Sequence, residues 1–255
     1  MPARLQKKVT KCGSVLKACR VQNTKGSALL LVWGIYFIVC GILFGGISAL
    51  EIGAAGWFIT ATASVVGVVL LLLRKMHIGN YLSYYQRQTG YSVEELQNAD
   101  RELMSYSAVK IGDVTERTGK KPVLMFIVTD HYFLSVGSIR GTYLRRLDDI
   151  VAAFYSCQIP QRGGYRQGLF VIARQDLQKK PSKNRMTKKW YGGYESGIMV
   201  WARDCEKLCR EVLTEMTGRA PHIIPYQNIV VSGMQYNLMS LDNWQADWAR
   251  IFGRY

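Results

Sequence analysis

Two long apolar runs occupy the first third of the chain. The runs from Ala28 to Ala49 and from Trp57 to Leu73 contain no charged residue, and a short connection around Glu51 separates them. Each run approaches the roughly 20 apolar residues that a helix needs to cross about 30 Å of hydrocarbon. The pattern predicts a transmembrane helical hairpin over residues 27–75, and therefore an integral membrane protein with two spans.

Small residues recur at intervals of four in both runs, so that they share one helix face. They are Gly41, Gly45 and Ala49 in the first run, and Gly56, Thr60 and Ser64 in the second. Small side chains allow the backbones of two membrane helices to approach closely. We expect Gly41, Gly45 and Gly56 to lie in a helix contact, and packing of the two helices on each other is favoured over homodimerisation.

Charged residues on either side of the hairpin indicate its orientation. Lys and Arg flank both outer ends, in residues 1–26 and at Arg74 and Lys75, whereas the connection carries only Glu51. Because cationic flanks stay in the cytoplasm, both termini are expected there, in an inner or plasma membrane. Residues 1–26 also place apolar side chains at intervals of three or four between lysines, which predicts an amphipathic helix on the inner leaflet.

After residue 76 the chain changes to the pattern of a folded domain. Ser92 and Glu95 form a capping box for a helix that runs to about Met104. Segments rich in β-branched and aromatic residues follow, each bounded by turn residues. These predicted strands are residues 108–114, 123–129, 132–136, 141–144, 150–155, 169–173 and 197–202. They predict a strongly bent antiparallel sheet or a small barrel.

A helix with a continuous apolar stripe is predicted next. Its residues are Cys205, Leu208, Cys209, Val212, Leu213 and Met216, with Asp204 as cap and Gly218 as end. We expect this helix to close the open end of the sheet or barrel. In the tail, residues 229–231 are strand-like, and an aromatic helical stripe runs from Trp244 to Phe252. Packing of the tail on the domain is favoured over a protruding or membrane-lying helix.

The formal net charge of +15 is confined to three places. They are residues 1–26, the pair Arg74 and Lys75, and residues 174–189, where seven cations accompany one acid. This distribution is typical of a protein that faces anionic lipid headgroups, where each cation contributes roughly 1 kcal/mol. Binding of nucleic acid is the alternative for a basic chain, and it is disfavoured because no recognised motif accompanies the charge.

The basic insert at residues 179–191 is the strongest candidate for a lipid-binding surface. Its candidate residues are Lys179, Lys180, Lys183, Arg185, Lys188, Lys189 and Trp190. Cations of this kind lie over headgroups while an amphipathic aromatic ring sits at the interface. A charged hairpin tip in solvent, without any lipid contact, is the alternative.

No residue pattern points to catalysis, a metal or a cofactor. The chain lacks a phosphate-binding glycine loop, a zinc-protease helix, a nucleophile elbow and a dinucleotide fingerprint. Asp130 and His131 are adjacent residues of a turn, where Asp is a favoured turn former. Cys205 and Cys209 share a helix face, and small buried hydrophobic side chains are favoured there over metal ligands.

Two stretches carry a resemblance to a known family. They are Phe126–Leu134, with the sequence FIVTDHYFL, and Leu144–Ala152, with the sequence LRRLDDIVA. This succession of a strand, a Thr-Asp turn and a second strand resembles bacterial pleckstrin-homology-like membrane proteins, a family largely without assigned function. The resemblance covers about Ala108 to Met216, and it implies a cytoplasmic domain of this kind joined to a transmembrane hairpin. The insert between Ala173 and Gly197 departs from a minimal domain.

We therefore expect an α+β fold in four parts. They are a basic amphipathic arm at 1–26, the hairpin at 27–75, a pleckstrin-homology-like cytoplasmic domain at 76–218 and an appendage at 219–255. The functional hypothesis is a non-enzymatic membrane protein whose domain binds anionic lipid of the inner leaflet, a protein partner or a second copy of the chain. An accessory subunit that acts through its transmembrane hairpin is the alternative, and a membrane-bound enzyme is a third reading.

Overall fold

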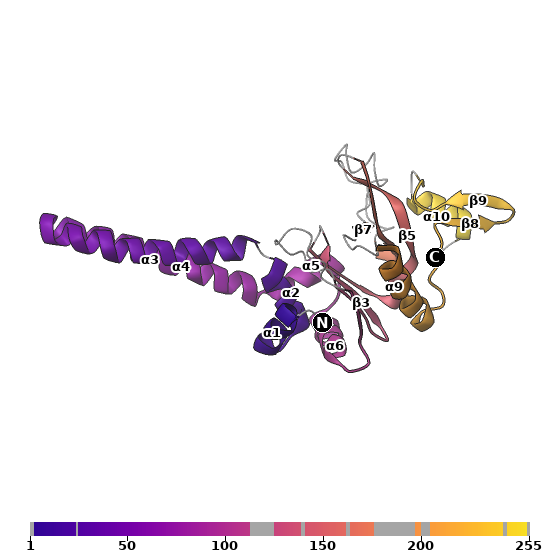
Figure 1. Ribbon diagram of the computed structural model, residues 1–255, viewed down its shortest axis with the longest axis horizontal. Coiled ribbons are helices and arrows are strands. Elements are labelled where there is room, and N and C mark those ends of the chain that lie inside the picture. The colour runs from indigo at the N-terminus through magenta and orange to yellow at the C-terminus, as the bar shows by residue number, and fades with distance from the viewer. Residues whose placement is uncertain are drawn as a thin grey trace. The chain divides into compact units, whose positions relative to one another are not determined.

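Two compact units make up the chain, and Figure 1 shows their elements. The helical unit comprises residues 7–97, and the sheet unit comprises residues 98–255 together with the first six residues. The computed structural model describes residues 3–23, 25–112, 125–138, 141–161, 164–175, 197–199, 205–241 and 244–253.

The helical unit follows the apolar pattern of the sequence. Its helices are α1 (Ala3–Cys12), α2 (Val15–Asn23), α3 (Lys25–Ile52), α4 (Ala54–Gly79), α5 (Tyr81–Thr89) and the start of α6 (Val93–Met104). Gly53 has a φ of 66° and separates α3 from α4, and Gly90 has a φ of 80° and follows α5. Glycine adopts this left-handed region without the steric cost that a Cβ brings, so both breaks follow from local chemistry.

The predicted capping box at the start of α6 is confirmed. The Ser92 amide donates a hydrogen bond to Glu95 Oε2 at 3.0 Å, and the Glu95 amide donates one to Ser92 Oγ at 3.1 Å. These two bonds satisfy backbone donors that the first turn of a helix leaves without partners. The helix accordingly begins at Val93.

Antiparallel strands in chain order form the sheets of the second unit. A four-stranded sheet contains β1 (Val109–Ile111), β2 (Met125–Val128), β3 (Tyr132–Ser138) and β4 (Gly141–Arg146). A three-stranded sheet contains β5 (Ile150–Gln161), β6 (Gly164–Ala173) and β7 (Gly197–Met199), and β8 (Asn228–Val231) pairs with β9 (Met234–Asn237). Each of the seven strands predicted ahead of the long helix is present in part or whole, whereas β9 was not predicted.

Two helices complete the sheet unit. The predicted stripe forms α9 (Cys205–Arg219), which contacts β1 and β2 of the larger sheet as well as β5 and β6. This helix runs through Gly218 to Arg219, so the expectation that Gly218 ends it is wrong by one residue. Helix α10 (Trp244–Phe252) forms the aromatic stripe of the tail.

Strands β5 and β6 are buried on both faces over much of their length. Along β6, Leu169 enters the core that the two larger sheets share with α9, and its neighbour Phe170 enters a second core formed with β8, β9 and α10. Trp248 of α10 belongs to this second core. Packing of the tail on the domain, which the sequence favoured, is therefore confirmed. A strand that is buried on both faces reads as a continuous apolar run rather than an alternation.

The predicted α+β class is confirmed, but no sheet closes into a barrel in the part of the chain that the structure describes. The edge of β5 supplies a reason. The Ala153 amide donates a hydrogen bond to the Ile224 carbonyl at 3.0 Å, and the Ile224 amide donates one to the Val151 carbonyl at 3.1 Å. Backbone groups that Ile224 has already paired are not free to add another strand there. The small barrel that the strand pattern predicted is therefore corrected to open sheets around shared cores.

Candidate membrane anchor and its basic base

Helices α3 and α4 pack against each other at positions that have no side chain. A Cβ placed on Gly41 of α3 would lie 2.8 Å from the Ala63 Cβ of α4. A Cβ placed on Gly67 of α4 would lie 2.5 Å from Ile38 Cγ1 and 2.7 Å from the Gly34 carbonyl oxygen. Real Cβ atoms do not approach other atoms so closely. The backbones of α3 and α4 therefore lie closer together at these positions than a residue with a Cβ would allow.

The three glycines named from the sequence have different surroundings. Gly41 lies in the contact between the helices, and Gly56 is buried at the start of α4. The surroundings of Gly45 lie outside the described residues. Sequence reasoning missed Gly34 and Gly67, because the search followed a spacing of four. Gly34 and Gly41 are seven residues apart, which is about two helical turns and places them on one face.

Outside this contact the hairpin presents apolar side chains to its surroundings. Trp33, Phe44, Trp57 and Phe58 are each more than half exposed, and Phe58 reaches 75%. One helical segment in the described chain, Gly56–Met76, is long and apolar enough to cross a membrane, and the apolar stretch Leu29–Phe44 of α3 is shorter. An exposed apolar surface of this extent marks an interaction site.

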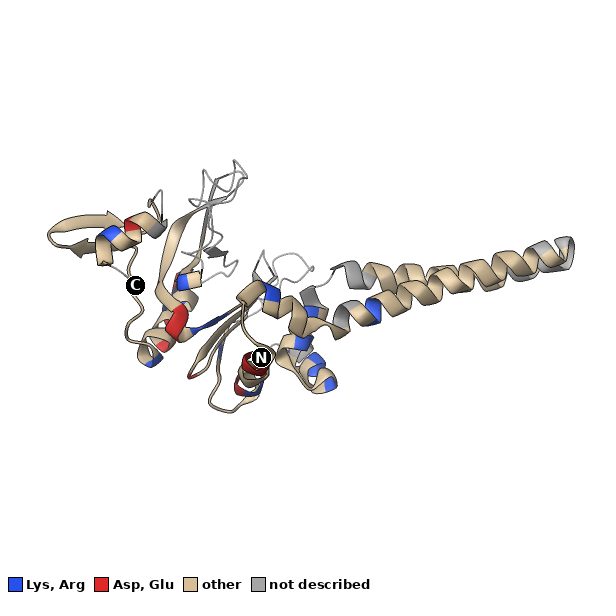
Figure 2. Ribbon diagram, turned by 180° about the vertical axis from the view of Figure 1, so that it is seen from behind, with Lys and Arg blue, Asp and Glu red and all other residues tan. Residues whose placement is uncertain are grey.

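Cationic residues surround one end of the hairpin, and we call them the basic base. The basic base consists of Lys7, Lys8, Lys11, Lys17, Arg20, Arg74 and Lys75. Figure 2 shows Lys and Arg gathered over α1, α2 and the adjoining end of α4, while the rest of the described hairpin shows neither blue nor red. Within residues 1–93 the only acidic residue is Glu51, near the opposite end of the hairpin.

Helix α2 is attached to α5 by specific contacts. Leu16 and Cys19 are fully buried, and the Tyr85 hydroxyl donates a hydrogen bond to the Leu16 carbonyl at 3.3 Å. The Arg20 guanidinium lies 3.8 Å from the centre of the Tyr84 ring, a cation–π arrangement. We expected the apolar face of residues 1–26 to rest on the inner leaflet. For α2 this is corrected, because tyrosine-bearing α5 covers that face.

The basic insert predicted as a lipid-binding surface lies outside the described residues. This applies to Lys179, Lys180, Lys183, Arg185, Lys188, Lys189 and Trp190. The candidate lipid-facing surface that the structure does describe is therefore the basic base, which comes from the N-terminal arm and from the end of α4.

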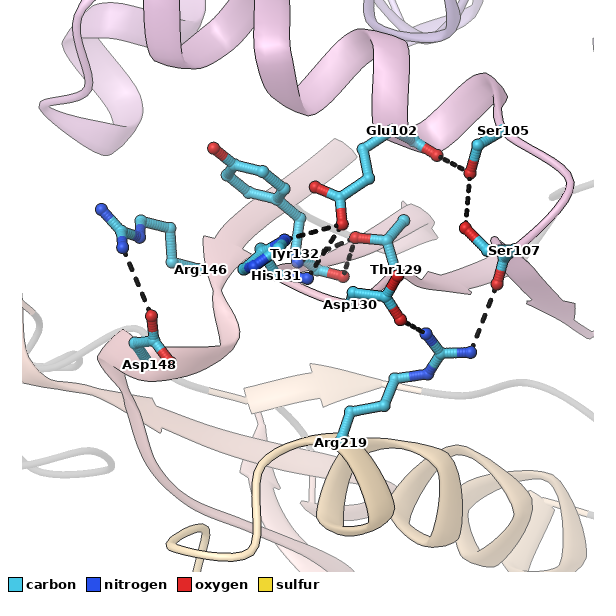
Figure 3. Close-up of polar contacts among 10 residues, drawn as sticks. All are labelled: Glu102, Ser105, Ser107, Thr129, Asp130, His131, Tyr132, Arg146, Asp148 and Arg219. Carbon is cyan, nitrogen blue, oxygen red and sulfur yellow. Dashed lines mark hydrogen bonds and ion pairs between the residues drawn. The ribbon is translucent and has the colours of Figure 1, made fainter.

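A polar cluster fixes the turn between β2 and β3, as Figure 3 shows. The Tyr132 amide donates a hydrogen bond to Thr129 Oγ1 at 2.9 Å, which closes the turn. Next to it, Asp130 forms an ion pair with Arg219 of α9. The His131 amide donates to Glu102 Oε1 of α6 at 3.1 Å. Asp130 and His131 thus contact different helices, and these contacts hold the turn in place.

The cysteine pair lies in the core. Cys205 and Cys209 are buried on the face of α9 that packs against the sheets. A hydrogen bond with the Cys205 thiol, together with burial, raises the pKa of Cys209 above its usual range. The described residues contain no group of three or more His, Cys, Asp or Glu that could hold a metal ion. Burial of the two side chains in the core is as their spacing on one helix face predicted.

Comparison of the chain with known protein families, with curated proteins and with solved structures found no match.

Proposed function

We propose that this protein is a membrane-anchored, non-enzymatic binding protein. Helices α3 and α4 cross the bilayer as a hairpin, and the sheet unit stays on the cytoplasmic side, where it binds a protein partner or anionic lipid. The observation that carries the proposal is the uncharged surface of α4 from Trp57 to Leu73, where most of the large apolar side chains are exposed. In lipid such a surface costs no free energy, whereas in water it would be a liability for aggregation.

The dimensions of the hairpin support two spans. Helix α3 has 28 residues and α4 has 26, which correspond to about 42 Å and about 39 Å at 1.5 Å per residue. Both lengths exceed the ~30 Å of a hydrocarbon core. Trp57 lies near the connection between the helices, and Tyr81 and Tyr84 follow the other end of α4. Aromatic rings of this type are enriched at the two membrane interfaces.

The basic base supports the orientation. Its cations flank the outer ends of both helices, and the connection at the other end of the hairpin carries only Glu51. Short cationic flanks are retained on the cytoplasmic side during insertion. Since both flanks favour the same side, the sheet unit that follows α4 and α5 is expected there too.

The order of elements in the sheet unit supports a pleckstrin-homology-like domain. Among the described residues, seven antiparallel strands run in chain order through a four-stranded and a three-stranded sheet, and α9 then packs on both. The resemblance noted in the sequence implies the same succession of strands followed by a closing helix. Because the sequence carries none of the catalytic motifs considered, we assign the domain a binding role rather than a catalytic one.

Labelling of cysteines with a membrane-impermeant maleimide tests the anchor and its orientation. Cys157 is exposed on the sheet unit, and Ala54, the first residue of α4, is exposed next to the connection between the helices. In intact cells, an Ala54→Cys variant is expected to react, whereas Cys157 reacts only after the membrane is permeabilised. Labelling of Cys157 in intact cells would overturn the orientation, and recovery of the chain in the soluble fraction would overturn the anchor.

Replacement of the hairpin separates this proposal from an accessory subunit that acts through its transmembrane helices. An unrelated two-span hairpin in place of residues 27–75 is expected to preserve recruitment of the sheet unit's ligand to the membrane. If the replacement inserts normally and recruitment is nevertheless lost, the transmembrane helices themselves make the functional contact.

A further inference from the structure

Arg74 is the first charged residue after the uncharged run of α4, and one hydrogen-bond donor of its side chain has no partner among the described residues. Its Nε atom is buried, and among the residues that the structure describes no hydrogen-bond acceptor lies within range of it. Guanidinium groups carry five donors, and a buried donor without an acceptor costs free energy. The arrangement therefore calls for an acceptor that the described residues do not provide.

A second guanidinium, that of Arg20, lies on α2, a helix that contacts both α4 and α5. The ring of Tyr84 lies beneath this guanidinium and is itself packed against Tyr85, with the ring centres 5.2 Å apart. Because Tyr85 is in turn hydrogen-bonded to the Leu16 carbonyl, Arg20 is held by the fold rather than left as a free surface cation.

The residues around Arg74 and Arg20 favour a negatively charged ligand. Residues 52–93 contain no acidic side chain, so neither α4 nor α5 supplies a carboxylate for these cations. If α4 crosses the bilayer, Arg74 follows the last apolar residue of the span and lies at the depth of the lipid phosphates. Arginine is suited to phosphate because its planar donors match phosphate oxygens in pairs.

We infer that the junction of α2, α4 and α5 is a binding site for a phosphate group, with Arg74 and Arg20 as its ligands, and that the phosphate belongs to an anionic phospholipid of the inner leaflet. The inference rests on the proposed membrane anchor and deepens it. It assigns lipid recognition to two arginines of the helical unit and leaves the basic insert at residues 179–191 out of this site.

Binding of short-chain phosphatidylglycerol to the full-length protein in a nonionic detergent tests the site. Short-chain phosphatidylcholine, which carries a phosphate but no net charge, and inorganic phosphate form the other two arms. We expect phosphatidylglycerol to bind saturably and phosphatidylcholine to bind weakly. Saturable competition by millimolar inorganic phosphate alone would instead identify a soluble phosphate ligand and overturn the lipid assignment.

An Arg74→Gln variant is expected to bind phosphatidylglycerol about tenfold more weakly, because it loses charge-assisted hydrogen bonds to the phosphate. Arg87→Gln is the matched control, since Arg87 is exposed on α5 and the change in charge is identical. An Arg74→Lys variant keeps the charge but has no Nε donor, and it is expected to recover only part of the affinity. Unchanged melting temperatures in phosphatidylcholine show that the variants are folded.

Equal losses for Arg74→Gln and Arg87→Gln would mean general attraction between cations and lipid, and would overturn the defined site. Unchanged affinity of a folded Arg74→Gln variant would overturn it as well. Both results leave the membrane anchor intact, because the anchor depends on the hairpin being membrane-embedded and not on lipid affinity. A chain that stays soluble and monodisperse without detergent would instead remove the proposed function itself.

Discussion

The backbone of Gly34 in α3 lies directly against Gly67 in α4, so that a Cβ on Gly67 would come within 2.7 Å of the Gly34 carbonyl oxygen. Inside a bilayer apolar side chains are already out of water. Two helices therefore associate there through close packing rather than through the hydrophobic effect. The contact between these two glycines therefore sets how near α3 and α4 can come. It also leaves the larger apolar side chains to cover the outside of the hairpin.

A methyl group at this contact is expected to force the hairpin apart. The change Gly67→Ala brings the new Cβ against backbone that has no room to move, and overpacking of this kind costs about 1–3 kcal/mol. Gly79→Ala, in the same helix, meets no atom within 4 Å and leaves stability unchanged or slightly higher. Thermal unfolding of the full-length protein in detergent measures both, and equal melting temperatures would contradict the close contact.

The ion pair between Arg219 and Asp130 is expected to contribute measurably to the stability of the sheet unit. The Arg219 side chain is 21% exposed and also donates to the Ser107 carbonyl at 3.2 Å, so Arg219→Gln should cost about 1 kcal/mol. Arg210→Gln on the same helix removes only an exposed pair with Glu206 and should cost less than about 0.5 kcal/mol. Denaturant unfolding of the full-length protein measures both changes.

A double-mutant cycle with Asp130→Asn isolates the coupling between the two side chains. The coupling is expected to shrink in high salt, because both groups are partly in solvent. A coupling of zero would mean that Arg219 acts through its other contacts, with the Ser107 carbonyl and with Glu215.

Trp248 is expected to hold the tail on the domain. Its ring is 96% buried in the core that contains Phe154 and Phe170, and removal of a buried aromatic side chain costs about 3–5 kcal/mol. The change Trp248→Ala should therefore lower the melting temperature and make the tail sensitive to proteases. Tyr106→Ala, at a fully exposed aromatic position, should change stability by less than about 0.5 kcal/mol. Resistance of the Trp248 variant to proteolysis would contradict this packing.

The buried cysteines predict a pattern of thiol reactivity. Cys157 is exposed and should react with maleimide in the native protein, whereas Cys205 and Cys209 should react only after unfolding. Mass spectrometry of protein labelled before and after denaturation measures this difference. Native labelling of Cys209 at the rate of Cys157 would show that α9 is not packed as described.

The raised pKa of Cys209 also predicts a loss of stability at alkaline pH. Between the unfolded pKa of about 8.5 and the higher folded value, the folded state keeps a proton that the unfolded state has released. The free energy of unfolding therefore falls as pH rises above about 8.5, by at most ~1.4 kcal/mol per pH unit for one group. Cys209→Ala should flatten this slope in unfolding curves recorded from pH 7 to pH 10.

Local patterns in the sequence predicted the elements well, and they predicted the contacts between elements poorly. The capping box of Ser92 and Glu95 was predicted because both partners lie within one helical turn. The contact of Gly67 with Gly34 and the pairing of Ile224 with β5 were not, because each joins segments that are far apart in the chain. Burial of Leu16 and Cys19 under α5 escaped prediction for the same reason, since an apolar helix face looks alike whether lipid or protein covers it.

The sequence by itself determined most of the helices and strands, where the charge lies, and that the two apolar runs are uncharged, because period, capping and turn chemistry act over a few residues. Only the tertiary structure decided which faces of the helices and strands pack against each other. It paired the glycines of α3 and α4, assigned α2 to the tyrosines of α5 and left the sheets open beside Ile224. Such choices depend on the shapes of complementary surfaces, which arise only once distant parts of the chain have met.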